Sequence, residues 1–197
     1  MSAAPGPRER PRPRDPRRRE VRIIAGEWGG RRLAPLRGRG IRPTTDRVRE
    51  AWMSAMGGDF TGLRALDLFA GSGALGLELL SRGAEHVTFV ERAPASLRVL
   101  RQNVGSVGAE GRASVVSSDV FRFLSESLET ASVPDLALAD PPYQSGASAR
   151  LVEAFLRAPF AQTLWVEHAS REALPDVPGL RQRRYGDTTL SALTRSP

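Results

Sequence analysis

Residues 64–76 read Arg-Ala-Leu-Asp-Leu-Phe-Ala-Gly-Ser-Gly-Ala-Leu-Gly, and this stretch decides the fold. It begins as a mostly apolar run typical of a buried strand, passes through closely spaced glycines, and continues into a leucine-rich helical segment. A strand, a tight loop and a helix form the first half of a βαβ unit. Glycines let the backbone approach a ligand, whose polar groups then meet the free N–H groups at the helix start.

Two cofactor classes fit this loop. Gly71, Gly73 and Gly76 have the G-x-G-x-x-G spacing, and Glu91 ends the next apolar run, as in a nicotinamide dinucleotide site. A carboxylate of Asp67 at the mouth of the loop would repel a pyrophosphate about 4 Å away by roughly 1 kcal/mol in water, and by about 4 kcal/mol at a dielectric constant of 20. The same carboxylate would attract the sulfonium and ammonium groups of S-adenosyl-L-methionine, which carries no phosphate. We therefore predict that cofactor, and a dinucleotide site or a plain tight turn are the alternatives.

The composition narrows the class of protein. A chain of 197 residues can form one domain with a full core, and its apolar runs have only strand length, so we expect no membrane span. The arginine-rich beginning has no apolar segment of the kind that a secretory signal needs, which predicts a soluble cytoplasmic protein. Cysteine is absent and the histidines are His86 and His168 alone, so we expect no disulfide, no cysteine catalysis and no metal.

The charge of the chain is unevenly distributed. Residues 1–49 hold fifteen Arg and five acidic residues, whereas residues 50–197 hold fourteen Arg and seventeen acidic residues. A basic front joined to a mildly acidic body indicates a polyanionic partner, and nucleic acid is the partner that we expect.

The basic front divides into two segments. Residues 1–20 alternate Pro and Arg with little apolar content, which predicts a disordered tail. Residues 21–60 contain a predicted β-hairpin, formed by 21–26 and 31–33, and a helix that covers the sheet. That helix begins at Thr45 or Asp46, and we expect Thr44 and Arg47 beside its start to contact the cofactor. The predicted RNA-binding residues are Arg22, Arg31, Arg32 and Arg42.

After the glycine loop, strands and helices alternate along the chain. Apolar runs predict strands at 86–91, 113–117, 135–140 and 163–167, and helical spacing predicts helices at 95–107, 120–128 and 149–157. This alternation predicts an α/β fold with a Rossmann-like, doubly wound and mostly parallel sheet, which binds ligands at the carboxyl ends of its strands. Two further runs, at 179–185 and 189–194, predict a C-terminal antiparallel hairpin.

Acidic residues stand at the ends of successive predicted strands, and in a parallel sheet these ends share one edge. Glu91 is suited to accept hydrogen bonds from both ribose hydroxyls of the cofactor. Asp119 is suited to accept one from the adenine amino group, beside an apolar wall, and it is equally suited to cap the helix that follows. The complete predicted cofactor-binding set is Asp67, Phe69, Ala70, Gly71, Ser72, Gly73, Glu91, Arg92, Asp119, Val120, Phe121, Thr44 and Arg47.

The predicted catalytic segment is the tetrapeptide Asp140-Pro141-Pro142-Tyr143 at the end of the fourth strand. A methyl group passes from sulfur to an exocyclic amine only if the nitrogen lone pair is aimed at the methyl carbon. A carboxylate and a carbonyl fixed by proline rigidity can accept the two N–H bonds of that amine, while an aromatic ring stacks on the base. Asp140 then acts either as a base or only as a positioning group. A double proline that merely stops a helix is the alternative interpretation.

Several of these runs together resemble the RsmD family. They are 22–26 (Arg-Ile-Ile-Ala-Gly), 42–50 (Arg-Pro-Thr-Thr-Asp-Arg-Val-Arg-Glu), 66–78, 81–84 and 140–143. The resemblance covers about residues 21–194 and implies a class I fold, with residues 61–197 as the S-adenosyl-L-methionine-dependent methyltransferase domain. It also implies methylation of the N2 amine of guanine 966 in 16S ribosomal RNA, in a 30S particle or an assembly intermediate. Trp52-Met53-Ser54 departs from the family pattern, in which Leu-Phe-Asn is expected.

Two other functions stay open at this point. A DNA adenine-N6 methyltransferase uses the same tetrapeptide logic, but it normally needs a sizeable target-reading domain, for which only residues 1–60 offer room. A non-catalytic RNA-binding ribosome assembly factor would keep the fold without turnover. In each case we expect a monomer.

Overall fold

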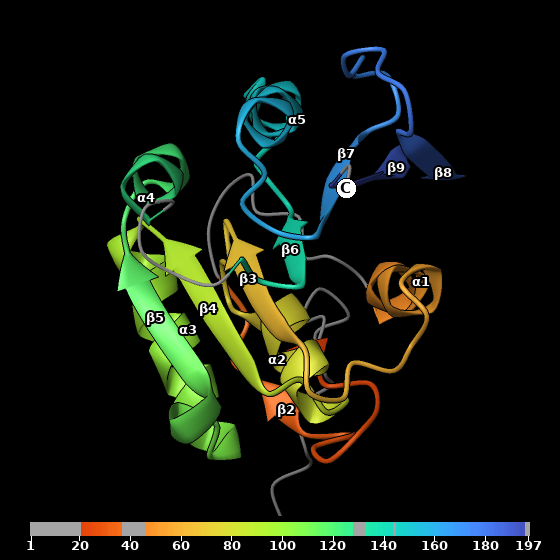
Figure 1. Cartoon of the computed structure of the whole chain (residues 1–197). Helices are drawn as coiled ribbons and strands as arrows, with labels where there is room; N and C mark the ends of the chain where they lie inside the picture. Colours follow the sequence, from red (N-terminus) through yellow and green to blue (C-terminus); the bar gives the residue numbers. More distant parts are fainter. Residues whose placement is uncertain (1–20, 37–45, 128–132, 144, 196–197) are drawn as a thin grey trace, which may run out of the picture.

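The computed structural model describes residues 21–36, 46–127, 133–143 and 145–195 of the chain. Its centre is a seven-stranded sheet with the order β5-β4-β3-β6-β7-β9-β8 (Figure 1). Neighbouring strands from β5 to β7 are parallel, while β9 runs antiparallel to both β7 and β8. The strands are β3 (Arg64–Leu68), β4 (His86–Glu91), β5 (Ala113–Ser117), β6 (Leu136–Ala139), β7 (Thr163–Ala169), β8 (Arg181–Tyr185) and β9 (Thr188–Thr194).

The central strands are apolar because helices cover both of their faces. β6 is buried throughout, and in β3 every residue after Arg64 is buried. Side chains alternate across the sheet, so the neighbours Phe89 and Val90 in β4 enter two separate apolar cores. Leu68 lies in register with Val90 on one side and with Ala139 on the other, so these three strands end at one level.

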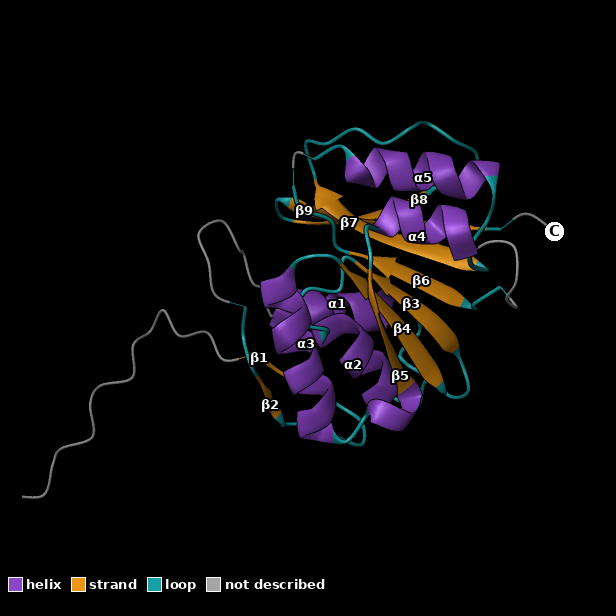
Figure 2. Cartoon of the chain, turned by 90° about the vertical axis from the view of Figure 1, so that its left-hand side faces the viewer, coloured by secondary structure: helices purple, strands orange, loops and turns teal. Residues whose placement is uncertain are grey.

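Each core is closed by its own set of helices (Figure 2). One face of the sheet carries α1 (Asp46–Ala55), α2 (Ala74–Ser81) and α3 (Pro94–Val107), and the other carries α4 (Val120–Ser127) and α5 (Ala147–Arg157). A short 3-10 helix, η1 (Glu110–Arg112), leads from α3 into β5. In the described part of the chain, no helix has both the length and the apolar character needed to cross a membrane.

The structure confirms the doubly wound sheet and the C-terminal hairpin, and β4 and β5 have the predicted bounds. α3 begins earlier than predicted because Pro94 occupies its first turn, where a missing N–H costs nothing. β7 continues beyond its predicted end, to Ala169, since its whole length pairs with β9. α5 begins at Ala147, also earlier than predicted. The predicted disordered tail, residues 1–20, lies outside the described residues.

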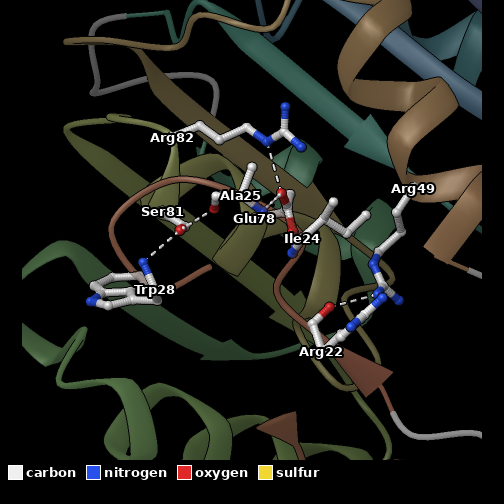
Figure 3. A network of polar contacts seen from close by, with 8 residues as sticks. All are labelled: Arg22, Ile24, Ala25, Trp28, Arg49, Glu78, Ser81 and Arg82. Atoms are coloured by element: carbon white, nitrogen blue, oxygen red, sulfur yellow. Dashed lines mark hydrogen bonds and ion pairs between the residues drawn. The ribbon is translucent and has the colours of Figure 1, made fainter. Parts of the chain in front are cut away.

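The predicted N-terminal hairpin is present and packs on α2. Its strands are β1 (Val21–Arg22) and β2 (Arg32–Leu33), which pair antiparallel. Figure 3 shows that Glu78 of α2 accepts hydrogen bonds from the backbone N–H groups of Ile24 (2.7 Å) and Ala25 (3.0 Å). The Glu78 side chain is fully buried, and Arg82 Nε donates to it as well (2.7 Å). One carboxylate therefore holds the hairpin to the helix.

Further hydrogen bonds complete this attachment (Figure 3). The Ser81 hydroxyl accepts the N–H of Trp28 (3.0 Å), and Arg49 in α1 donates to the carbonyl oxygen of Arg22 (2.7 Å). Gly26 has a φ of +83°, and a Cβ there would lie 1.9 Å from the Ser81 carbonyl oxygen. Only glycine fits at this point, so the hairpin approaches α2 as closely as backbone allows.

Candidate active site

The glycine loop between β3 and α2 is held in place by packing and by hydrogen bonds within the protein. A Cβ on Gly73 would lie 2.4 Å from Leu100 Cδ1, and a Cβ on Gly76 would lie 2.4 Å from Phe89 Cε1. Gly73 also has a φ of +79°, which glycine adopts without strain. The N–H of Ala70 donates to the carbonyl oxygen of Val90 (3.1 Å), which joins the loop to β4. The predicted spacing of the glycines therefore serves close packing of the loop.

Asp67 lies beneath the start of α2, and not at the mouth of the loop as the sequence suggested. The residue is 2% exposed, and Oδ2 accepts the N–H of Gly76 (2.9 Å). Burial raises the pKa of Asp67 to about 8, and the nearby charges of Asp140 and Glu91 act in the same direction. In the free protein, burial therefore favours the protonated form of Asp67 over the ionised form. The expected repulsion of a pyrophosphate assumed an ionised Asp67, and the raised pKa weakens this argument because burial disfavours the ionised form.

Glu91, at the end of β4, organises the neighbouring backbone. Its Oε2 accepts the N–H of Gly71 (2.9 Å), and its Oε1 accepts those of Arg92 and Ala93 (both 2.8 Å). A carboxylate has about four acceptor positions, so one remains. Glu91 can thus accept one ribose hydroxyl directly, and a second hydroxyl would have to replace one of these three donors.

Asp119 caps α4, which confirms one of its two predicted roles. Its Oδ1 accepts the N–H of Phe121 (3.0 Å), while Oδ2 pairs with the exposed guanidinium of Arg92 (3.1 Å). The contact with adenine stays a prediction. Val120 is buried, and the ring of Phe121 meets Phe69 edge to face, with centroids 6.2 Å apart.

Phe121 has a further neighbour that the sequence did not predict. The guanidinium carbon of Arg150, from α5, lies 3.7 Å from the ring centroid of Phe121. One side of the expected apolar wall is therefore covered by a cation.

The tetrapeptide that we predict to be catalytic, residues 140–143, follows β6 at the same edge of the sheet. Pro141 is buried, while Pro142 and Tyr143 are exposed, and the charge of Asp140 reaches both Asp67 and Tyr143. The Tyr143 hydroxyl donates to Glu167 Oε1 (3.0 Å) and contacts Thr188 Oγ1 (3.1 Å). Burial of this hydroxyl raises the pKa of Tyr143 to about 12. The phenol is thus fixed by hydrogen bonds while the side chain remains partly exposed at the edge.

Sequence reasoning missed Glu167 and Trp52. Glu167 lies in β7 and is buried, and its Oε2 accepts the indole N–H of Trp52 (2.9 Å) while Oε1 accepts the phenol. One carboxylate therefore connects α1 to the predicted catalytic tetrapeptide through Tyr143. The available signal was an acidic residue within an apolar strand.

Asn103 was missed for a similar reason. This buried side chain of α3 donates to the carbonyl oxygens of Ser72 (2.9 Å) and Ala34 (3.1 Å) and accepts the N–H of Ala34 (2.7 Å). It joins the glycine loop to the segment that follows the hairpin. Its signal in the sequence was a single amide among the apolar positions of the helix.

The predicted RNA-binding arginines are not all at this edge. Arg22, Arg31 and Arg32 are exposed on the hairpin, which is attached near the C-terminal end of α2, away from the glycine loop. Arg31 also donates to the carbonyl oxygen of Val107 at the end of α3 (3.4 Å). Arg42 and Thr44 lie outside the described residues, and the structure places Arg47 in the first turn of α1 without describing its side chain.

The strand ends therefore bring together Asp67, Glu91 and Asp140, with Asp119 joined to Arg92 beside them. Within the described ranges, no three His, Cys, Asp or Glu side chains are arranged to hold a metal ion. The arrangement suits a cationic ligand at the glycine loop and a planar, hydrogen-bonding ligand at the tetrapeptide.

Comparisons with known proteins agree with this geometry. Residues 21–194 match the family model described as "Conserved hypothetical protein 95", which is the model of the RsmD family. The ribosomal RNA small subunit methyltransferase D of Escherichia coli (strain K12) is 36% identical over 162 residues, which is 81% of this chain and 80% of that protein. The chain belongs to the RsmD family.

Comparison with solved structures identifies proteins that share this fold. A hypothetical protein from Thermus thermophilus is 30% identical to this RsmD-family chain, with a TM-score of 0.77 over 89% of this chain and 99% of that one. An RNA methyltransferase from Salinibacter ruber, solved with S-adenosyl-L-homocysteine, is 15% identical with a TM-score of 0.58, over 78% of this chain and 93% of that one. It shares the fold alone. Family and fold together make this chain a class I methyltransferase.

Proposed function

We propose that this RsmD-family chain methylates the exocyclic N2 amine of a guanine in small-subunit ribosomal RNA. The observation that carries the proposal is the placement of Asp140 and Tyr143 at the strand edge that also holds Asp67 and Glu91. Guanine 966 of 16S ribosomal RNA is the target that the sequence resemblance implies. The name of the Escherichia coli relative supports the small-subunit RNA as substrate.

The cofactor is S-adenosyl-L-methionine, which supplies the methyl group. The donor set fits it: Glu91 retains one acceptor position for a ribose hydroxyl, and the glycine loop brings backbone close to the ligand. Asp67 adds a second element of fit. A cation nearby favours the ionised carboxyl, so it would lower the raised pKa of Asp67 and gain an attractive partner.

The target amine is positioned by the tetrapeptide. Asp140 accepts one N–H of the amine, a backbone carbonyl fixed by Pro141 accepts the other, and the nitrogen lone pair is then free of the ring and points at the methyl carbon. Tyr143 stacks on the base, since its phenol is held by Glu167 and Thr188. As the carbon–nitrogen bond forms and the carbon–sulfur bond breaks, the amine proton leaves to Asp140 or to water.

Methyl transfer in vitro tests this proposal. Labelled cofactor is supplied with 16S ribosomal RNA, and separately with 30S particles, from cells lacking this gene, and the modified nucleoside is mapped by mass spectrometry. We expect one methyl group on the N2 amine of guanine 966, with more transfer to the particle or its assembly intermediate than to naked RNA, and with the enzyme acting as a monomer.

Two variants give this test its resolution. Asp140→Asn should lower kcat by about a hundredfold or more while leaving cofactor affinity within a few-fold. Asp176→Asn, in an exposed loop, is the matched control and should keep wild-type activity. Transfer to adenine in DNA would favour the DNA-modifying alternative. Cofactor binding without transfer to any RNA would overturn the proposed reaction, and undiminished activity of Asp140→Asn would remove Asp140 from the site.

A further inference from the structure

The edge strand β8 concentrates positive charge on an otherwise mildly acidic body. Its sequence is Arg-Gln-Arg-Arg-Tyr, and all five side chains are exposed. In the described part of the chain, none of its three arginines forms an ion pair with a carboxylate. Residues 50–197 as a whole hold more acidic residues than arginines, so this strand departs from its surroundings.

The register of the sheet shows which face these side chains share. Arg181 is opposite Ala192 and Arg183 is opposite Leu190, and directly opposed residues project to the same face. Ala192 and Leu190 belong to the apolar core that Trp52 of α1 also enters. Arg181 and Arg183 therefore lie on the α1 side of the sheet.

Tyr185, the last residue of β8, continues this row toward the active site. It is opposite Thr188, whose hydroxyl contacts the hydroxyl of Tyr143 (3.1 Å). Tyr143 and Tyr185 are exposed to a similar extent, 36% and 37%. β8 runs parallel to β7, so its C-terminal end is at the carboxyl edge of the sheet. The row Arg181, Arg183, Tyr185 thus ends beside the residue that we expect to stack on the target base.

We propose that this row is an RNA-binding surface, which holds the strand that flanks the target nucleotide. The inference rests on the proposed function, because it takes RNA as the substrate. Arg181 and Arg183 contact phosphates, and Tyr185 stacks on a neighbouring base. This surface is separate from the hairpin arginines, because the hairpin is attached near the C-terminal end of α2 whereas β8 is an edge strand of the sheet. The row ends with Tyr185 at the carboxyl edge of the sheet, so it leads the RNA toward the proposed catalytic residues.

A double variant, Arg181→Gln with Arg183→Gln, tests the charge. Its matched control is Arg122→Gln with Arg157→Gln, which removes two exposed arginines from α4 and α5 on the opposite face. The affinities for 16S ribosomal RNA and for 30S particles from cells lacking this gene are measured over a range of salt concentrations. We expect the double variant to bind about tenfold more weakly, with a salt slope smaller by roughly 1.4 to 2. The control should stay within twofold of wild type.

Tyr185→Leu tests the stacking contact separately. Loss of an aromatic platform should weaken RNA binding about fivefold or more without changing the salt slope, because no charge is removed. Calorimetry with the cofactor should give wild-type affinity for every variant, which shows that the fold is intact.

The outcomes separate this proposal from the proposed function. RNA affinity is measured without turnover, so the surface can be supported even if the wild type methylates no RNA, in which case only the proposed reaction falls. If the wild type methylates RNA and the double variant binds like the control, only the surface falls. Arginines on an edge strand also block edge-to-edge pairing. Self-association of the double variant in light scattering, with unchanged RNA affinity, would assign them that role and overturn ours.

Discussion

A buried carboxyl group lies at each end of helix α2, Glu78 within the helix and Asp67 on β3 beneath its start, and the two groups have very different surroundings. Glu78, near the C-terminal end, accepts two backbone N–H groups from the hairpin and a guanidinium N–H from Arg82. Asp67, beneath the N-terminal end, accepts one N–H and has the like charges of Asp140 and Glu91 nearby. Burial is almost complete at both. The number of donors distinguishes a group that binds the protein together from one that has capacity left for a ligand.

The largest expected effect comes from removing the fully paired group. Glu78→Ala leaves the N–H groups of Ile24 and Ala25 and the guanidinium of Arg82 without their acceptor. We expect the free energy of unfolding to fall by about 3–5 kcal/mol, measured by denaturant titration. Glu153→Ala, at an exposed position of α5, is the control and should change it by less than about 0.5 kcal/mol. A loss of stability below about 1 kcal/mol in Glu78→Ala would contradict the claim that Glu78 holds the hairpin to the helix.

Asp67→Asn tests the opposite case, a buried carboxyl group whose ionisation destabilises the folded protein. The unfolded carboxyl ionises near its ordinary pKa of 3.8, whereas the folded one stays protonated up to about pH 8. The unfolded state then binds fewer protons, so the wild type loses stability as the pH rises through this window. The amide can still accept the Gly76 N–H and does not ionise.

We therefore expect the variant to gain stability relative to wild type by up to about 1.4 kcal/mol per pH unit between pH 5 and 7, with no further gain above about pH 8. Thermal unfolding at several pH values measures this difference. Cofactor affinity should fall in the same variant, because the amide cannot ionise beside a cation. Parallel stability curves for the two proteins would mean that Asp67 is not protonated in the folded state.

Glu167→Gln examines an intermediate case, a buried carboxyl with donors from Trp52 and Tyr143. The amide retains one acceptor oxygen and turns an N–H group toward the other donor. We expect a loss of about 1–2 kcal/mol in stability and a roughly tenfold lower kcat, since the Tyr143 phenol is no longer fixed. An unchanged KM for the cofactor would distinguish this from a general defect. Wild-type kcat would show that Tyr143 needs no support from Glu167.

The smallest effect is expected where a carboxylate faces water. Arg64 and Glu85 form an ion pair at 3.5 Å, and both side chains are more than half exposed. Arg64→Gln should change the free energy of unfolding by less than about 0.5 kcal/mol in denaturant titration, because Glu85 stays hydrated. A larger loss of stability would show that the number of partners determines the effect of removing a charged group even where that group is exposed.

Much of the fold followed from the sequence because strand and loop signals were strong. The apolar runs of β4 and β5 gave the correct bounds, and the glycines at 71–76 gave the loop. The position of β9 did not follow, since it depends on long-range pairing. Leu190 and Ala192 of β9 fill the core beside β7, while the exposed arginines of β8 require the edge of the sheet, where they stay in contact with water.

The site was predicted less completely, for a geometric reason. Strand alternation places Asp67 on the same face as its partner Phe89, under α2, while Leu66 and Leu68 enter the other core. Which face an isolated Asp takes depends on the helix packed above it, and the sequence does not specify this. Glu167 was likewise assigned only to a strand, because its partners are distant in the chain. Charges and turns were predictable, whereas buried polar partners were not.

The hydrogen bonds of Asn103 couple the motion of the glycine loop to that of the segment after the N-terminal hairpin. Because one buried amide binds both Ser72 in the glycine loop and Ala34 after the hairpin, motion of either segment must break bonds to the other. A ligand that reduces the motion of the glycine loop should then slow amide hydrogen exchange at Ile23 and Ile24, even though the ligand contacts neither residue. The rate of hydrogen exchange in the N-terminal hairpin would thereby indicate whether a ligand is bound at the glycine loop.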